Sequence, residues 1–190
     1  MRAILISRTT DCAASYAGRR QMVTAKEDEM ANQVRPVPEG YHTVTPYLYI
    51  RGATQAIDFY KRAFGAEERY RMPGPDGRIG HAELTLGDSI IMLADEMPEH
   101  GIKSPHSLSG TSVSLAVYVE DADAAFNRAV DAGATVLQPL KDQFYGDRSG
   151  KVADPYGHQW SLMTHVEDVS PEEMSKRMQA EFGAMAGTQS

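Results

Sequence analysis

One pattern of predicted elements occurs twice in the sequence, and this internal repeat constrains the fold more than any other feature. Each copy predicts a strand, a helix and then three strands, which together form a βαβββ module of about 60 residues. The copies are in step, because Thr45 corresponds to Ser114 and Met92 to Ser161, both at a spacing of 69 residues. We therefore expect an α+β fold of two tandem modules that need each other to close a core.

Hydrophobic periodicity locates the elements within each copy. In the first copy, apolar residues alternate through the strand 44–50, and helical spacing follows up to a stop at Gly65. The ranges expected there are 44–50, 53–64 (the helix), 66–72, 79–86 and 89–94. The second copy predicts a strand over 112–119, a helix over 122–132, two further strands and a closing strand over 159–164.

The modules occupy residues 42–96 and 110–168 of a domain that spans residues 42–168. Residues 1–41 read as a flexible leader and linker. The first 26 residues are basic, which indicates either a targeting peptide or a mis-assigned start with Met22 or Met30 as the initiator. Residues 169–190 predict a helix and tail, capped by Ser170.

The C-terminal helix has an apolar stripe at Met174, Met178 and Phe182. The spacing of i, i+4 and i+8 places these side chains on one face. Such a stripe is more typical of a packing surface than of a cofactor site.

Composition excludes several classes of function. A net charge of −7 argues against nucleic acid or an anionic membrane as the main partner. Cys12 is the only cysteine, so neither an intramolecular disulfide nor a cysteine-built zinc site is possible. No apolar run approaches the length of a membrane span, and we expect a cytoplasmic protein. No nucleophile elbow, phosphate-binding glycine loop or dinucleotide fingerprint is present.

Four segments resemble the vicinal oxygen chelate superfamily, which includes glyoxalase I, extradiol dioxygenases and the bleomycin and fosfomycin resistance proteins. They are Ile57-Asp58-Phe59-Tyr60, His81-Ala82-Glu83-Leu84, Phe144-Tyr145-Gly146-Asp147-Arg148-Ser149-Gly150 and Asp154-Pro155-Tyr156-Gly157-His158. The second and third resemble in particular the glyoxalase-like subgroup named after a phosphonate operon. The resemblance implies a curved mixed sheet that forms a cup, with helices packed outside, and it implies pairing into a homodimer.

The resemblance also identifies four positions at which metal-dependent members carry their ligands. In this sequence they are Thr45, Met92, Ser114 and Ser161. A thioether and three hydroxyls provide neither imidazole nor carboxylate, so we expect no metal and no other cofactor.

Strand alternation indicates which side chains face the cup. Across the turn at Gly87, Glu83 is expected opposite Met92, with His81 on the same face as Glu83. Glu83 is then either a general base with His81 as its partner, or a member of an internal ion pair or a solvated group. A remodelled metal site that uses both residues is a third alternative. His42 and His165 lie near strand ends and are expected at the surface.

Further side chains complete the expected ligand site. On the inner face are Thr45, Tyr47, Tyr49, Met92, Ser114, Tyr118, Gln159 and Ser161. Arg148 either anchors an anionic ligand or forms a loop salt bridge with Asp147 or Asp154. Tyr145 either lines the cavity mouth or packs with Phe144. Trp160 alternates to the helix side and is expected in the core.

Three functions are compatible with this pattern. The first is a metal-free protein that binds a small organic ligand between aromatic walls. The second is a lyase or isomerase that uses Glu83 as general base, with or without an atypical metal site. The third is a structural or regulatory role that depends on dimerisation.

Overall fold

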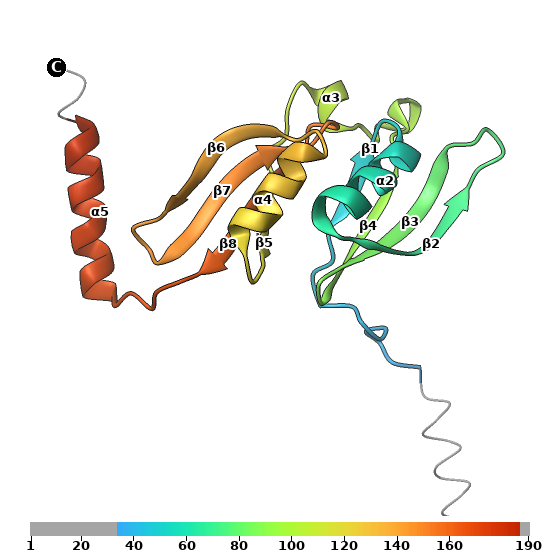
Figure 1. Cartoon of the computed structure of the whole chain (residues 1–190). Coiled ribbons are helices and arrows are strands. Elements are labelled where there is room, and N and C mark those ends of the chain that lie inside the picture. Colours follow the sequence, from blue (N-terminus) through green and yellow to red (C-terminus); the bar gives the residue numbers. More distant parts are fainter. Residues whose placement is uncertain (1–33, 187–190) are drawn as a thin grey trace, which may run out of the picture. The chain divides into compact units, whose positions relative to one another are not determined.

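The structure, a computed structural model that describes residues 34–186, contains both predicted βαβββ modules (Figure 1). The chain divides into two compact units, Met1–Glu39 and Gly40–Ser190, and the modules lie in the second. Residues 34–39 of the first unit are exposed and form no helix or strand. The predicted leader 1–26 lies outside the described residues. Within residues 34–186, no helix combines the length and apolar composition that a membrane crossing requires.

The first module is a four-stranded mixed sheet with one long helix. Its elements are β1 (Tyr47–Ile50), α2 (Ala53–Phe64), β2 (Glu67–Pro73), β3 (Ile79–Leu86) and β4 (Ser89–Asp95). The strand order is β1-β4-β3-β2, in which β1 runs parallel to β4 and the other neighbours are antiparallel. The parallel pair arises because the helix carries the chain between strands that are not hairpin neighbours.

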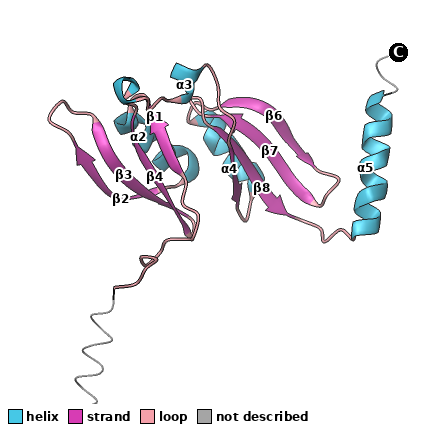
Figure 2. Cartoon of the chain, turned by 180° about the vertical axis from the view of Figure 1, so that it is seen from behind, coloured by secondary structure: helices cyan, strands magenta, loops and turns pink. Residues whose placement is uncertain are grey.

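The second module repeats this topology. Its elements are β5 (Ser114–Tyr118), α4 (Ala122–Asp131), β6 (Thr135–Asp142), β7 (Asp147–Ala153) and β8 (Gln159–His165). The strand order β5-β8-β7-β6 matches that of the first sheet, and Figure 2 shows β6, β7 and β8 of this sheet from behind. The modules are joined by a connection with a short helical turn, η1 (Pro98–His100), and α3 (Pro105–Leu108). The helix α5 (Pro171–Ala186) follows β8, and the α+β class with tandem modules is confirmed.

Both modules begin later than the alternation predicted. The predicted strand 44–50 starts at Tyr47, and Val44 is 82% exposed. Pro46 explains this start, because it has no N–H and contributes only its carbonyl, which accepts from the Met92 amide at 2.9 Å. In the second copy, Val113 is 61% exposed and its amide bonds the Thr111 hydroxyl instead of a strand.

The sequence repeat is also a repeat of helix capping. The Asp95 carboxylate accepts hydrogen bonds from the amides of Gly52 and Ala53, the first groups of α2. Sixty-nine residues later, the Thr164 hydroxyl accepts from the Ala122 amide at the start of α4. Thus the end of the last strand in each module satisfies the start of its helix, with a carboxylate in one copy and a hydroxyl in the other.

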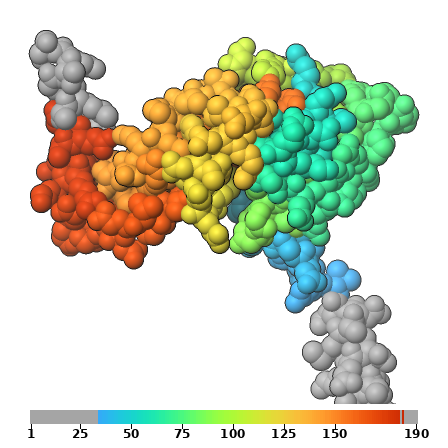
Figure 3. Space-filling view, viewed as in Figure 1, coloured from blue at the N-terminus to red at the C-terminus, as the bar shows by residue number. Residues whose placement is uncertain are grey.

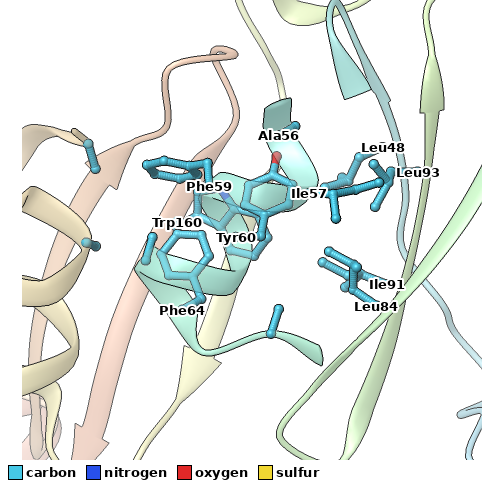
Figure 4. Packing of buried hydrophobic residues seen from close by; sticks show 14 of the residues in the cluster. Leu48, Ala56, Ile57, Phe59, Tyr60, Phe64, Leu84, Ile91, Leu93 and Trp160 are labelled. Atoms are coloured by element: carbon cyan, nitrogen blue, oxygen red, sulfur yellow. The ribbon is translucent and has the colours of Figure 1, made fainter. Parts of the chain in front are cut away.

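The core joins the two modules through their helices. The space-filling view shows α4 (yellow) against α2 (teal), and the Arg128 Nε donates to the Ala63 carbonyl at 3.0 Å (Figure 3). Trp160 of β8 is 1% exposed and packs on Tyr60 and Phe64 of α2, with ring centroids 5.3 and 4.5 Å apart (Figure 4). The placement of Trp160 in the core, predicted from alternation, is confirmed.

Asp154 accepts hydrogen bonds from both modules at the contact between α2 and β8. Its Oδ2 accepts from the Tyr60 hydroxyl at 2.8 Å and from the Trp160 indole at 2.9 Å. Its Oδ1 accepts from the amides of Tyr156 and His158 at 2.9 Å each. The residue is 5% exposed, and burial together with the Asp154 charge raises the pKa of the Tyr60 hydroxyl. A buried carboxylate with four donors is satisfied without a cation.

Replacing Asp154 with Ala should destabilise the fold strongly, because the hydroxyl of Tyr60 and the indole N–H of Trp160 lose their acceptor while they stay buried. We expect a loss of about 3–5 kcal/mol in the free energy of unfolding, measured by urea denaturation. Tyr60→Phe, which removes one donor and keeps the packing, should cost about 1–2 kcal/mol. A loss below about 1 kcal/mol for Asp154→Ala would contradict this role.

Candidate functional site

The register of β3 and β4 sorts their side chains between two faces as predicted. Glu83 pairs with Met92 and Ala82 with Leu93. Ala82 and Leu93 are both 0% exposed and belong to the core under the helices. The opposite face of the sheet therefore carries Glu83, Met92 and His81.

A chain of hydrogen bonds connects three side chains on that face. The Tyr47 hydroxyl lies 2.9 Å from His81 Nδ1, and His81 Nε2 lies 3.3 Å from Glu83 Oε1. Tyr47 comes from β1 and the other two from β3, so the order β1-β4-β3 places them across β4 from each other. The predicted contact between His81 and Glu83 is present.

Glu83 is 8% exposed and has further partners on its other side. Its Oε2 lies 3.5 Å from Nη1 of Arg69, whose guanidinium lies 5.5 Å from the centre of the Tyr41 ring. The hydrogen bond to Glu83 raises the pKa of the Tyr41 hydroxyl. Of the alternatives that the sequence allowed for Glu83, this arrangement corresponds to the internal ion pair, and Arg69 is the cation.

A cavity of about 670 Å³ lies beside Tyr47, the first of these hydrogen-bonded side chains. Its walls are the exposed edge of β1, the start of β5 and the connection between the modules. The lining residues are Pro46, Tyr47, Leu48, Tyr49, Lys103, Pro105, Leu108, Gly110, Thr111, Ser112, Val113, Leu115, His158 and Gln159. The rings of Tyr47 and Tyr49 lie 5.0 Å apart, and burial raises the pKa of the Tyr47 hydroxyl. The volume suits one small organic molecule.

A buried carboxylate holds the connection that forms one wall of the cavity. Glu96 accepts from Arg51 Nε at 2.6 Å, from the Ser104 amide at 2.9 Å and from the Ser107 hydroxyl at 2.6 Å. Burial raises the pKa of Glu96, but these hydrogen bonds outweigh that effect and hold its pKa at about 2. The carboxylate therefore stays ionised and ties α3 to the end of β4.

The predicted site residues are divided between this cavity and other places. Tyr47, Tyr49 and Gln159 line the cavity. Ser114 and Ser161 lie together on the second sheet, with their hydroxyl oxygens 3.5 Å apart. Thr45 donates to the backbone carbonyl of His42 at 3.2 Å.

The donor chemistry at the four family metal positions does not fit a divalent ion. Thr45, Met92, Ser114 and Ser161 offer hydroxyls and a thioether, with no anionic or imidazole donor. In residues 34–186, no group of three or more His, Cys, Asp or Glu side chains is arranged to hold a metal ion.

Three of the predicted residues are engaged within the second module. The Tyr118 hydroxyl donates to Asp147 at 2.9 Å, and the Tyr145 hydroxyl lies 3.5 Å from the Ser149 hydroxyl. Arg148 is held by Asp123 and by Asp142, the latter at 3.1 Å. The salt-bridge alternative for Arg148 is therefore present, but its expected partners, Asp147 and Asp154, were wrong.

The histidines expected at the surface have polar partners. The exposed His42 lies 3.3 Å from the Ser89 hydroxyl. The exposed His165 lies 2.8 Å from Asp147 and 3.0 Å from Asp168. The hydrogen bonds to these two carboxylates raise the pKa of His165.

Sequence reasoning missed Arg69, Lys103 and His158 as members of the site. Arg69 belongs to the edge strand β2, where a bulge between Glu68 and Tyr70 interrupts the alternation that would have placed it. Lys103 lies in an irregular connection with no periodicity. His158 lies in the turn before β8, where strand alternation does not predict the direction of a side chain.

Residues 41–162 match the Glyoxalase/Bleomycin resistance protein/Dioxygenase superfamily, and the chain belongs to this family. The match covers the first module and the second as far as residue 162, and it confirms the resemblance found from sequence. The narrower phosphonate-operon subgroup stays a prediction.

Individual relatives agree with this assignment. The chain is 45% identical over 157 residues to an uncharacterized protein of Mycobacterium tuberculosis, Rv0887c, a match that covers 81% of this chain and 89% of that protein. Two solved structures at 30% identity are TioX from Micromonospora, with a TM-score of 0.53 over 66% of this chain and 99% of that one, and the Arabidopsis thaliana product of At5g48480. The latter has a TM-score of 0.54 and covers 64% and 97% of the two chains.

The lowered pKa of Glu96 predicts that the stability contributed by its contacts with Arg51, Ser104 and Ser107 is lost in acid. Since the folded pKa of about 2 lies below the ordinary value of 4.5, the contribution of Glu96 to stability is complete above about pH 4.5. It is lost as the pH falls from there toward about 2. Glu96→Gln should cost on the order of 2 kcal/mol at pH 7 and about half of that or less at pH 3, measured by urea denaturation.

Glu67→Gln, at an exposed position on β2, is the matched control and should change stability little at either pH. An equal loss of unfolding free energy for Glu96→Gln at pH 7 and pH 3 would refute this role of the Glu96 carboxylate.

Proposed function

We propose that this protein binds a small organic ligand in the cavity between β1, β5 and the connection of the modules. The observation that carries the proposal is that Tyr47, Tyr49 and Gln159, three residues selected from sequence as ligand-binding, line one cavity of about 670 Å³. Apolar walls with a few polar groups favour a ligand with an aromatic or otherwise flat apolar body.

The proposal is for binding without a metal. It is supported by the hydroxyl and thioether donors at the four family metal positions. It is supported further by Glu83, whose carboxylate is already paired with Arg69 and approached by His81. Both oxygens of this carboxylate therefore already have a partner within the protein.

Tyr49→Ala should weaken binding of a flat aromatic probe such as 2-naphthol about tenfold, because one ring of the aromatic wall is removed. Isothermal titration calorimetry measures this change. Phe144→Ala, which removes an aromatic side chain outside the cavity, is the control and should leave affinity unchanged. Equal affinities of wild type and Tyr49→Ala would refute binding at this cavity.

A second candidate is a lyase or isomerase that uses Glu83 as general base. The hydrogen-bond chain favours it, because Tyr47 lines the cavity and leads through His81 to Glu83. A proton taken from a ligand by the Tyr47 hydroxyl oxygen would be relayed, as Tyr47 gives its own proton to His81 Nδ1 and His81 gives its Nε2 proton to the Glu83 carboxylate.

Glu83→Gln separates the two candidates. For a binding protein, probe affinity should stay within about threefold of wild type, because Glu83 does not line the cavity. Turnover of the methylglyoxal–glutathione adduct should be undetectable in wild type, and elemental analysis should show no stoichiometric transition metal. Turnover that disappears in Glu83→Gln would establish the enzyme instead.

We further propose that the protein acts as a homodimer in the cytoplasm. Within the described residues, ion pairs such as Lys141–Glu181 and Arg177–Glu167 connect α5 to the rest of the chain, and Met178 is 41% exposed. The side of α5 that carries Met174 and Met178 is the surface that we assign to a second copy. The side chain of Phe182, the third residue of the predicted stripe, lies outside the described residues.

A further inference from the structure

We infer that the cavity selects ligands that donate a hydrogen bond to Tyr47, such as phenols, alcohols and amides with an N–H, over ligands that only accept one. This inference rests on the proposed function, because it names the chemical class of ligand for the same cavity. The observation that carries it is the direction of the hydrogen bonds among Glu83, His81 and Tyr47, which leaves the Tyr47 oxygen without a free proton.

The partners of Glu83 set that direction. The guanidinium of Arg69, which is always charged and only donates, has its Nη1 3.5 Å from Glu83 Oε2. The hydrogen bond to Glu83 raises the pKa of the Tyr41 hydroxyl, so this neighbour keeps its proton and is a donor as well. A carboxylate beside a guanidinium is ionised and only accepts. The Nε2 of His81, 3.3 Å from Glu83 Oε1, must therefore carry the proton of that contact.

The imidazole of His81 passes the direction on to Tyr47. In a neutral imidazole one nitrogen donates and the other accepts. Because Nε2 carries the hydrogen, Nδ1 is the acceptor, and the Tyr47 hydroxyl at 2.9 Å must donate to it. The imidazole lies between the rings of Tyr47 and Tyr70, whose centroids are 5.5 and 5.6 Å from its own, and this packing keeps its orientation.

The Tyr47 oxygen is left with lone pairs only. A phenol has a single proton to donate, and that of Tyr47 is already used on His81. Tyr47 lines the cavity and is 38% exposed, and its hydroxyl is only partly buried, so a ligand can reach the oxygen. A ligand N–H or O–H finds an acceptor there. A ligand carbonyl meets a lone pair instead, and it gives up its hydrogen bonds to water without replacement.

The tautomer of His81 is tested without any ligand. Long-range proton–nitrogen correlation spectra of the ¹⁵N-labelled full chain at pH 8 distinguish a protonated ring nitrogen from an unprotonated one. His81→Phe assigns the signals, because it removes those of this ring. We expect Nε2 to be protonated and Nδ1 to be unprotonated. A ring that is protonated at Nδ1, alone or together with Nε2, would overturn the inference whatever the cavity binds.

Two probes with the same flat body test the selectivity by equilibrium dialysis against the full chain at pH 8. The first, 2-naphthol, donates through its hydroxyl, whereas 2-acetylnaphthalene offers only a carbonyl acceptor. We expect 2-naphthol to bind about fivefold more tightly, which is the difference expected for one hydrogen bond. Tyr47→Phe keeps the ring and removes the acceptor oxygen. It should reduce this ratio about threefold or more by weakening the binding of 2-naphthol.

A second variant tests the part played by His81. His81→Phe keeps an aromatic ring between the two tyrosines but releases the Tyr47 proton, which can then be donated to a ligand. The affinity for 2-acetylnaphthalene should therefore rise about threefold, while that for 2-naphthol changes little. A purely structural role of His81 predicts weaker binding of both probes instead. His100→Phe, at an exposed position in η1, is the matched control, and circular dichroism verifies that each variant folds.

The outcomes separate this inference from the proposal beneath it. If both probes bind in a Tyr49-dependent manner, and neither Tyr47→Phe nor His81→Phe changes the ratio of their affinities, the selectivity is wrong while binding at the cavity stands. If neither probe binds the wild-type protein, the cavity is not a site for flat organic ligands, and both proposals fall.

Discussion

The fold depends on one buried carboxylate, Asp154, which binds groups from both modules at once. Tyr60 comes from the helix of the first module and Trp160 from the last strand of the second, and both donate to the same oxygen. Neither module has a core of its own that would bury these aromatic residues. The junction makes two small repeats into one unit, and it also fixes the turn that leads to His158 and the cavity.

Much of the architecture followed from the sequence because it depends on local chemistry. The two-residue turn at Gly87 and the alternation on either side determine the register, so the pairing of Glu83 with Met92 was predicted correctly. Helix ends were predictable for the same reason, since Gly65 adopts φ 69° and closes α2. The starts of the first strands were placed too early, because alternation continues through Pro46 although hydrogen bonding does not.

The candidate site was predicted less completely, because it depends on contacts between distant segments. The carboxylate that holds Arg148 most closely belongs to Asp123, on α4, and nothing in the local sequence identifies it. Lys103 and His158 reach one cavity only through the path of the connection and the turn after Asp154. The face on which a strand residue lies can be predicted from the alternation of side chains. The position of a residue in an irregular segment depends on contacts throughout the fold.

The two copies of the module use different side chains at equivalent positions. Asp95 accepts a hydrogen bond from the first amide of α2, and Thr164 accepts one from the first amide of α4. The segment between them has no counterpart within the repeat, yet it supplies a wall of the cavity and is tied down by Glu96. Changes in this segment therefore alter the wall of the cavity without touching the core residues of either repeat. The connection is thus the part of the cavity wall that the internal repeat does not supply.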